Sequence, residues 1–220
     1  MLSHPLFQAY LEILLRENAK HNLTAITDPE EIRQKHFADS LALLEGAPCP
    51  VPPGAFLLDV GSGGGFPGVP LKIARPDISL TLLEATRKKA DFLKLLLEEL
   101  GLEGEVVNAR AEDAARDPAY RGRFDVVTAR AVAALPVLCE LCLPFVKPGG
   151  AFIALKGQSE KAQEELHAAR AAIKTLGGEV ERVQSETTIY GERTRIILRK
   201  ISRTPAEYPR NYGAMLKKAL

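Results

Sequence analysis

The sequence predicts an α/β fold: a mostly parallel sheet of seven strands, an antiparallel hairpin at one edge, and an added helical segment at the N-terminus. From residue 56 onward, short apolar runs alternate with segments of helical periodicity, which is typical of parallel strands joined by crossover helices. The last two apolar runs, at 180–183 and 194–199, have no helix between them and are expected to pair as a hairpin. Before residue 45, apolar residues recur at helical spacing.

Two helices are expected before the first strand. Ser3 is predicted to cap the first helix, with Pro5 in its first turn. The apolar stripe of this helix consists of Phe7, Tyr10, Leu11 and Leu14. The second helix begins at residues 28–31, where Asp is at the N-cap position, Pro is first in the helix and Glu is placed for a capping box. It is expected to end near Leu44, and residues 45–54 are expected to form a loop.

The remaining elements follow from the alternating pattern. Strands are expected at 56–60, 80–84, 105–108, 125–129 and 151–156, before the hairpin. Helices are expected at 68–74, after Thr86, at 135–144 and after Ser159, the last one ending at Gly177-Gly178. A turn is expected at Lys147-Pro148-Gly149-Gly150, and a loop is expected between residue 108 and the strand at 125–129.

The most informative stretch is LLDVGSGGGFPG, residues 57–68, because an apolar strand runs directly into five glycines within eight positions. Glycine lets the backbone turn sharply and lets a ligand approach main-chain N–H groups that a side chain would cover. The next strand ends in Glu84, 23 residues after Gly61. A carboxylate at this strand tip is where an adenosine ribose needs an acceptor for its hydroxyls. The pattern therefore predicts a nucleoside-bearing cofactor.

Two kinds of cofactor could account for this sequence pattern. The spacing Gly63-x-Gly65-x-x-Gly68 fits a dinucleotide fingerprint, but the nearby Pro67 and Pro70 suit a pyrophosphate poorly. S-adenosylmethionine needs a glycine-lined turn and a ribose acceptor but no phosphate site, and the antiparallel edge hairpin favours it. An NAD-dependent oxidoreductase stays the alternative, and titration with the two cofactors separates them. A non-catalytic adenosine- or RNA-binding module would bind the cofactor and transfer no methyl group.

Composition excludes several classes of protein. The chain has 220 residues, 46% of them hydrophobic and 26% charged, which is ordinary for a globular protein. No apolar run approaches the roughly 20 residues that span a bilayer, and the N-terminus lacks the features of a signal peptide. The expected compartment is the cytoplasm, with no membrane contact. Cys139 and Cys142 form a single C-x-x-C without further ligands nearby, so packed thiols are expected and no metal site.

Positive charge is concentrated near the end of the sequence. Residues 191–220 contain eight Lys or Arg against two Glu, a net charge of +6, although the whole chain carries +1. A basic end on a mildly acidic body suggests contact with a polyanion, and a solvated tail is the alternative.

Six motifs together resemble one family. They are Asn22-Leu23-Thr24-Ala25-Ile26, His36-x-x-Asp39-Ser40-Leu41, DVGSGGGFPGVPLKI, Arg110-Ala111-Glu112, Ala129-Arg130-Ala131 and Leu155-Lys156-Gly157. The combination resembles the RsmG (GidB) family of class I, Rossmann-like methyltransferases, and the resemblance covers nearly the whole chain. That family methylates N7 of a guanine in the 530 loop of bacterial 16S ribosomal RNA. The resemblance implies S-adenosyl-L-methionine as cofactor, S-adenosyl-L-homocysteine as product, and 16S ribosomal RNA or a small-subunit particle as partner.

The candidate positions lie at the ends of the strands: residues 61–66, 84–86, 108–112, 128–130 and Lys156. Cofactor contacts are expected from nine of these residues. They are Gly61, Gly63, Phe66, Glu84, Ala85, Thr86, Ala111, Glu112 and Arg130. The glycines would present backbone to the methionyl part, Glu84 would accept both ribose hydroxyls, and Glu112 would lie near the adenine amino group. Phe66 either closes over the cofactor or belongs to the core. Arg130 could pair with the cofactor carboxylate, as the family implies, or hold an RNA phosphate.

No catalytic residue is assigned. Guanine N7 carries a lone pair and no proton, so methyl transfer to it needs no general base. His36 and Asp39 are the candidates for contact with the base, on a helix expected to cover its pocket; the alternative is a polar patch that packs this helix onto the sheet. The residues expected to meet RNA phosphates are Arg87, Lys88, Arg210, Lys217 and Lys218.

Three parts of the chain are expected. Residues 1–54 would form an N-terminal helical cap, residues 55–201 the methyltransferase domain, and residues 202–220 a basic C-terminal tail.

Overall fold

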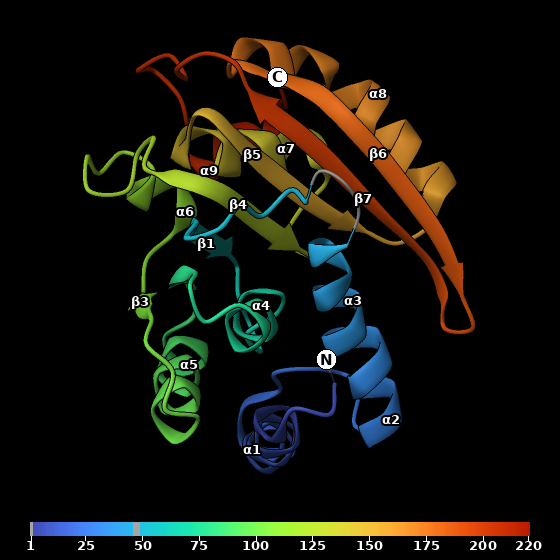
Figure 1. The fold of residues 1–220 in the computed structure, drawn as a ribbon. Helices are drawn as coiled ribbons and strands as arrows, with labels where there is room; N and C mark the ends of the chain where they lie inside the picture. The colour runs from blue at the N-terminus through green and yellow to red at the C-terminus, as the bar shows by residue number, and fades with distance from the viewer. Residues whose placement is uncertain (1, 46–48) are drawn as a thin grey trace. The chain divides into compact units, whose positions relative to one another are not determined.

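A computed structural model describes residues 2–45 and 49–220, so residues 46–48 of the predicted loop lie outside the described part (Figure 1). The chain forms two compact units, residues 1–109 and 110–220. The strand order is β3-β2-β1-β4-β5-β7-β6, that of a seven-stranded sheet with an antiparallel pair at one edge. This confirms the predicted fold class. The predicted domain limits, after residues 54 and 201, stay a prediction.

The first unit contains three parallel strands and the N-terminal helices. Its elements are α1 (Pro5–His21), α2 (Pro29–Ile32), η1 (Arg33–Ala38), α3 (Asp39–Leu41), η2 (Ala42–Leu44), β1 (Phe56–Val60), α4 (Gly68–Ala74), β2 (Ser79–Leu83), α5 (Arg87–Glu99) and β3 (Glu105–Val107). Val60 pairs with Leu83, and Leu83 with Val107, so the three strands end at the same level. The residues that follow these strands therefore lie at one edge of the sheet.

The two predicted N-terminal helices are present, with one correction. The first helix is capped by His4 rather than Ser3, since the His4 ring nitrogen accepts the Leu6 N–H at 3.3 Å. The second begins as predicted: Asp28 is the N-cap, and its carboxylate accepts the Glu31 N–H at 2.8 Å. It continues to residue 44, but its middle, η1, is a π-helix.

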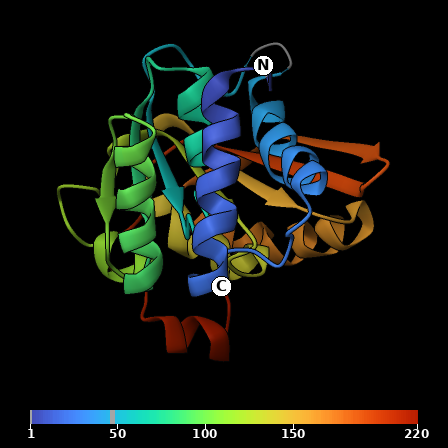
Figure 2. The same cartoon turned by 90° about the horizontal axis from the view of Figure 1, so that it is seen from below.

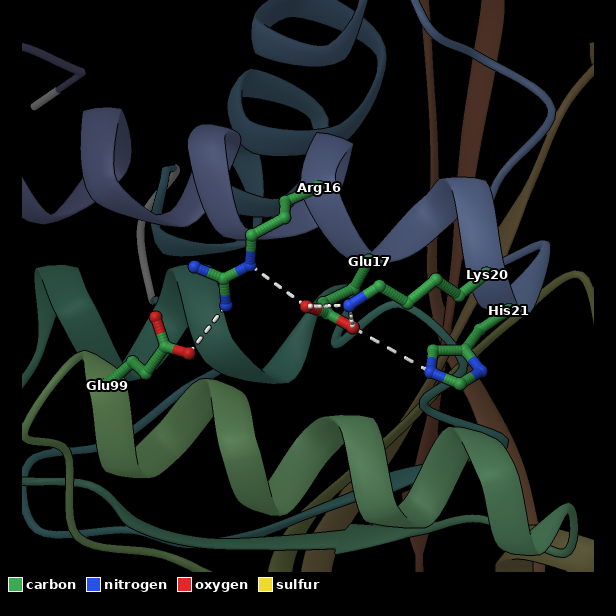
Figure 3. A network of polar contacts seen from close by, with 5 residues as sticks. All are labelled: Arg16, Glu17, Lys20, His21 and Glu99. Atoms are coloured by element: carbon green, nitrogen blue, oxygen red, sulfur yellow. Dashed lines mark hydrogen bonds and ion pairs between the residues drawn. The ribbon is translucent and has the colours of Figure 1, made fainter.

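Helix α1 lies alongside α5, and the helical segment 29–44 lies on its other side (Figure 2). Arg16 connects α1 to α5, because its guanidinium donates to Glu99 at 2.5 Å (Figure 3). Glu17 is buried next to it and accepts from Arg16 at 2.9 Å and from Lys20 at 3.1 Å. Hydrogen bonds from Arg16 and then Lys20 lower the pKa of Glu17. The otherwise costly burial of this carboxylate is compensated within α1 itself.

The second unit contains four strands and five helical segments. Its elements are α6 (Ala111–Ala114), β4 (Phe124–Arg130), α7 (Leu135–Cys142), η3 (Leu143–Phe145), β5 (Val146–Lys156), α8 (Ser159–Thr175), β6 (Gly178–Thr188), β7 (Gly191–Lys200) and α9 (Tyr212–Lys217). Strand β7 pairs antiparallel with both β5 and β6, which confirms the predicted hairpin. Helix α8 runs along β6 and β7 (Figure 1). Cys139 and Cys142 are fully buried in α7, and burial raises the pKa of the Cys139 thiol.

Two local predictions were wrong. The turn expected at 147–150 is an irregular part of β5: pairing shifts from Phe124 with Val146 to Val126 with Ala151, so these four residues bulge from the ladder. The loop expected after β3 contains α6. Residues 202–220, for which the sequence predicts no element, contain α9. Both helices are too short, at 4 and 6 residues, to show a periodic pattern in the sequence.

Three arginines attach the C-terminal segment to the second unit. The Arg121 guanidinium donates to four backbone carbonyls, those of Ala115, Thr204, Pro205 and Tyr208, at 2.8–3.0 Å. Arg116 donates to the Pro209 carbonyl at 2.5 Å. Arg210 forms a bidentate ion pair with Glu140, which is 1% exposed. Of these three arginines, Arg210 alone belongs to the basic segment 191–220, and its charge is used within the fold.

Lys200, at the end of β7, is 1% exposed. Its ammonium group donates to the Leu176 carbonyl at 2.5 Å and to the Thr204 hydroxyl. Burial, with a smaller contribution from the charge of Arg121, lowers the pKa of Lys200 from 10.5 to about 7. A buried amine without an acidic partner favours its neutral form.

We expect Lys200 to make folding stability depend on pH. Between about pH 7 and about pH 10 the unfolded chain holds a proton on this amine that the folded chain has released. The free energy of unfolding of the wild type, relative to Lys200→Met, should therefore rise with pH by about 1 kcal/mol per pH unit across this window. Urea unfolding at several pH values measures it, with the exposed Lys174→Met as matched control. If the free energy of unfolding of the wild type, relative to Lys200→Met, fell as the pH rises, the prediction would be contradicted.

Candidate functional site

The glycine turn follows β1 directly and contains three residues with left-handed backbone. The φ angles of Gly61, Gly63 and Gly65 are +70°, +54° and +96°, which L-residues with a Cβ rarely adopt. The N–H groups of Gly61 and Ser62 donate to the Leu83 carbonyl at 2.8 and 3.2 Å. The turn is thereby attached to the last residue of β2, next to the carboxylate that the sequence predicts as the ribose acceptor.

Glu84 holds the turn from the other side. One of its carboxylate oxygens accepts the Gly63 N–H at 3.0 Å, and the other accepts the Thr86 N–H at 2.8 Å. The residue is 7% exposed, and no basic side chain in the described part of the chain forms an ion pair with it. A carboxylate offers about four acceptor sites. Each oxygen therefore retains a site, which fits a ligand that brings two neighbouring hydroxyls.

Asn108 is one of the strand-end candidates from the sequence, but no cofactor contact is predicted for it. It follows β3, and its side-chain amide donates to the carbonyls of Glu84 and Ala85 at 2.9 and 3.1 Å. Ala85 and Thr86 are exposed and continue the backbone into α5. Asn108 thus fixes the main chain that carries the Glu84 side chain. Its place at the end of a strand was the available signal.

Phe66, which ends the glycine turn, is 5% exposed and lies in an aromatic cluster. Its ring is stacked on Tyr10 with centroids 5.2 Å apart and on His36 at 4.6 Å. Phe37 completes the cluster. This position favours a core role for Phe66, and its contact with a cofactor stays a prediction. The structure brings together Gly61, Gly63, Phe66, Glu84, Ala85 and Thr86 in the first unit.

His36 and Asp39, the candidates for contact with the base, lie in the helical segment 29–44. His36 belongs to the π-helix η1, a distortion often found at functional sites. Its Nε2 lies 2.9 Å from the Thr24 hydroxyl, and its ring covers Phe66. Asp39 begins α3 and is half-buried. Both the packing role and the base-contact role are compatible with these positions.

In the second unit, Ala111 and Glu112 begin α6. Glu112 pairs with Arg110 at 3.1 Å, and the Arg110 guanidinium lies 4.8 Å from the centre of the Tyr212 ring in α9. The acid predicted near the adenine is thus attached to the C-terminal helix through one arginine.

Arg130 is the last residue of β4, and Ala131 after it has left-handed backbone, with φ +58°. The loop that follows is held by Lys156, whose ammonium group donates to the Ala133 carbonyl at 2.9 Å and to Glu165 at 2.6 Å. Glu165 also accepts the Leu135 N–H at 2.7 Å. Strain of this kind in a residue with a Cβ persists where surrounding contacts impose it, and such residues cluster at active sites.

The residues predicted to meet RNA differ in their surroundings. Arg87 and Lys88 are exposed in the first turn of α5, where Arg87 pairs with Asp91 at 3.1 Å. Lys217 and Lys218 are exposed at the end of α9. Arg210 differs from these four because its guanidinium is already bound to Glu140 at 2.7 Å.

The second unit also contains a cavity of about 780 Å³, lined by residues 157–160 and 191–193 at the start of α8 and the tip of the hairpin. None of the predicted site residues lines it.

Within residues 2–45 and 49–220, no helix is long and apolar enough to cross a bilayer. In the same residues no group of three His, Cys, Asp or Glu could hold a metal ion.

Comparison with solved structures shows the fold. The chain superimposes on an O-methyltransferase from Bacillus cereus in complex with SAH, with a TM-score of 0.60 and 19% identity, over 86% of this chain and 90% of that one. It also superimposes on cofactor-bound Rv0187 from MTB, with a TM-score of 0.61 and 20% identity, over 92% of each chain. Both similarities concern the fold alone, an α/β fold with a mostly parallel sheet.

Comparison of sequences shows the family. Residues 3–194 match the family described as GidB, rRNA small subunit methyltransferase G. The chain is 46% identical to ribosomal RNA small subunit methyltransferase G of Lactobacillus delbrueckii subsp. bulgaricus, over 97% of this chain and 90% of that protein. It is 45% identical to the protein of that name from Pelotomaculum thermopropionicum, over 97% and 89%. These matches agree with the motifs and the glycine turn, and the chain belongs to the GidB family of small-subunit ribosomal RNA methyltransferases.

Proposed function

We propose that this protein transfers a methyl group from S-adenosyl-L-methionine to N7 of a guanine in the 530 loop of 16S ribosomal RNA, in the cytoplasm. Membership of the GidB family supports the activity and the class of substrate. The observation that carries the cofactor assignment is Glu84, a buried carboxylate with one N–H donor on each oxygen and room for two more.

The residues of the first unit fit the nucleoside end of this cofactor. When bound, S-adenosylmethionine supplies a methyl group on a positively charged sulfur. Glu84 would accept both ribose hydroxyls in charge-assisted hydrogen bonds. Gly61 and Gly63 carry no side chain that would cover their backbone, and they would face the methionyl part. For Ala111, Glu112 and Arg130, in the second unit, contact with the cofactor is implied by the family resemblance.

The chain needs no general base for this reaction, since guanine N7 presents a lone pair without a proton. Its residues have to align the base with the methyl group and exclude water, which in favourable cases contributes about 7–11 kcal/mol. His36 and Asp39 are our candidates for contact with the guanine. A carboxylate at Asp39 would favour the positive charge that develops on the base.

The RNA would meet exposed basic residues at two places, Arg87 and Lys88 on α5 and Lys217 and Lys218 on α9. A guanine in a duplex has its edges in a deep groove, so the target has to be in a loop or turned out of the helix. Small-subunit particles and naked 16S ribosomal RNA are both substrates to be tested.

We expect the double variant Lys217→Gln, Lys218→Gln to bind RNA with a weaker salt dependence. Each lost phosphate contact lowers the slope of log affinity against log salt by about 0.7–0.9, so the double variant should lose about 1.5 units of slope. Binding to a fragment containing the 530 loop, measured at several salt concentrations, tests this. Lys161→Gln, Lys174→Gln on α8 removes the same charge elsewhere and should leave the slope unchanged. Equal slopes for all three proteins would exclude these lysines from the interface.

The decisive experiment for the proposed function is transfer of a radiolabelled methyl group to small-subunit particles from cells that lack this protein, followed by mapping of the modified base. Label at N7 of a guanine in the 530 loop is the expected result. Label at another nucleotide would assign the activity to a different RNA site. Absence of transfer to any RNA would contradict the proposed methyltransferase function.

A further inference from the structure

Two peptide groups in the glycine turn have glycine on both sides, and one of them joins Gly64 to Gly65. Its carbonyl accepts the hydroxyl of Tyr10 at 2.5 Å, and its N–H donates to the Ser62 carbonyl at 2.7 Å. Both polar groups of this peptide are therefore engaged, one of them by a side chain 54 positions away in the sequence.

Glycine on both sides makes rotation of this peptide easy, because no Cβ opposes the change in backbone angles. The turn therefore depends on hydrogen bonds for its shape. The Ser62 contact lies within the turn and moves with it. The Tyr10 hydroxyl belongs to α1, so it fixes the carbonyl relative to a separate element.

Tyr10 itself is held firmly. It is fully buried, its ring is stacked on Phe66 with an interplanar angle of 11°, and it contacts Phe37 at 5.0 Å. A Cβ atom added at Gly65 would lie 2.5 Å from the Tyr10 hydroxyl oxygen, which shows how closely the phenol approaches the turn. Helix α1 is in turn attached to α5 by the Arg16–Glu99 contact (Figure 3). Glu99 is the last residue of α5, at the end remote from Glu84, so this contact holds α1 in place without touching the predicted nucleoside site.

We infer that Tyr10 is a positioning residue for cofactor binding: its hydroxyl fixes the Gly64–Gly65 peptide and thereby keeps the Gly63 N–H on the Glu84 carboxylate. The inference rests on the proposed function, because it assumes that the glycine turn and Glu84 hold S-adenosylmethionine. If Tyr10 acts in this way, the N-terminal helix α1 preorganises the cofactor site before the cofactor binds.

The test is the variant Tyr10→Phe, which keeps the stacked ring and removes the hydroxyl. The dissociation constant for S-adenosylmethionine, measured by calorimetry on the full chain, should rise about three- to tenfold, the effect of losing one buried hydrogen bond. The KM for this cofactor should rise by a similar factor, and the KM for the RNA substrate should not change. In the cofactor-free protein, the Gly65 amide should exchange its hydrogen faster than in the wild type.

The control is Phe7→Leu, in the same helix. Phe7 packs on Phe37, which in turn packs on Phe66, so a side chain separates Phe7 from the glycine turn. It should lower the melting temperature and leave the dissociation constant unchanged. An unchanged constant in Tyr10→Phe, or an equal rise in both variants, would overturn the inference. If the wild type binds no S-adenosylmethionine, the proposed function fails instead, and unchanged Gly65 exchange in Tyr10→Phe would then overturn the inference on its own.

Discussion

Replacing Glu84 with glutamine should weaken binding of S-adenosylmethionine by about 100-fold or more. The carboxylate is expected to accept two ribose hydroxyls, and hydrogen bonds to charged groups contribute about 1.5–3 kcal/mol each. The glutamine amide keeps the shape of the side chain but has an NH₂ group in place of one oxygen. That group would face the N–H of either Gly63 or Thr86, so the variant also loses one contact that shapes the turn.

Calorimetry with S-adenosylmethionine and with its demethylated product measures this effect. The matched control is Glu98→Gln, an exposed glutamate on α5, which should bind the cofactor like the wild type. Circular dichroism should show that Glu84→Gln is folded, because the three strands of the first unit do not depend on this carboxylate for their pairing. Wild-type affinity in a folded Glu84→Gln protein would remove the central residue of the proposed site.

Replacing Arg210 with alanine should destabilise the protein by about 3 kcal/mol, although the residue lies in the segment that the sequence predicts to be a tail. Its guanidinium pairs with Glu140 through two hydrogen bonds of 2.9 and 2.7 Å, and its backbone N–H donates to the same carboxylate at 2.7 Å. Glu140 is 1% exposed. Removing one partner of a buried ion pair leaves the other charge buried alone, which costs more than the pair contributes.

Urea unfolding measures the loss, and Arg203→Ala is the matched control because it removes an exposed arginine from the same segment. Adding Glu140→Gln to Arg210→Ala should recover part of the stability, since the buried group is then neutral. If Arg210→Ala unfolds like the wild type but binds RNA more weakly, the ion pair contributes little, and the predicted phosphate contact gains support.

The central pattern of the site could be predicted from the sequence because it is local. A strand that enters a glycine-rich turn, and an acid at the end of the next strand, are adjacent patterns with few structural solutions. The register of β1, β2 and β3 then brings Gly61, Glu84 and Asn108 to one edge of the sheet. The family resemblance added the substrate, which no pattern of residues could identify.

The contacts that complete the site could not be predicted, because they join residues far apart in the chain. Tyr10 fits the apolar stripe of α1 as well as any core aromatic does, and nothing in the sequence indicates that its hydroxyl meets Gly64. Arg210 and Arg121 appear in the sequence only as positive charge. The structure uses both within the second unit, on the buried Glu140 and on backbone carbonyls. Among the basic residues counted at 191–220, Arg195, Arg199 and Arg210 pair with glutamates and Lys200 is buried. Net charge therefore overstated how much of this end is available to RNA.

The strand order β5-β7-β6 has a consequence for how the second unit is made. Translation delivers β6 before β7, yet β6 pairs only with β7 within this sheet, and β7 fills the place beside β5. Until β7 leaves the ribosome, the newly made β5 has an open edge and β6 has no strand with which to pair. A nascent chain paused in this interval should be the form most prone to aggregate and to be captured by chaperones.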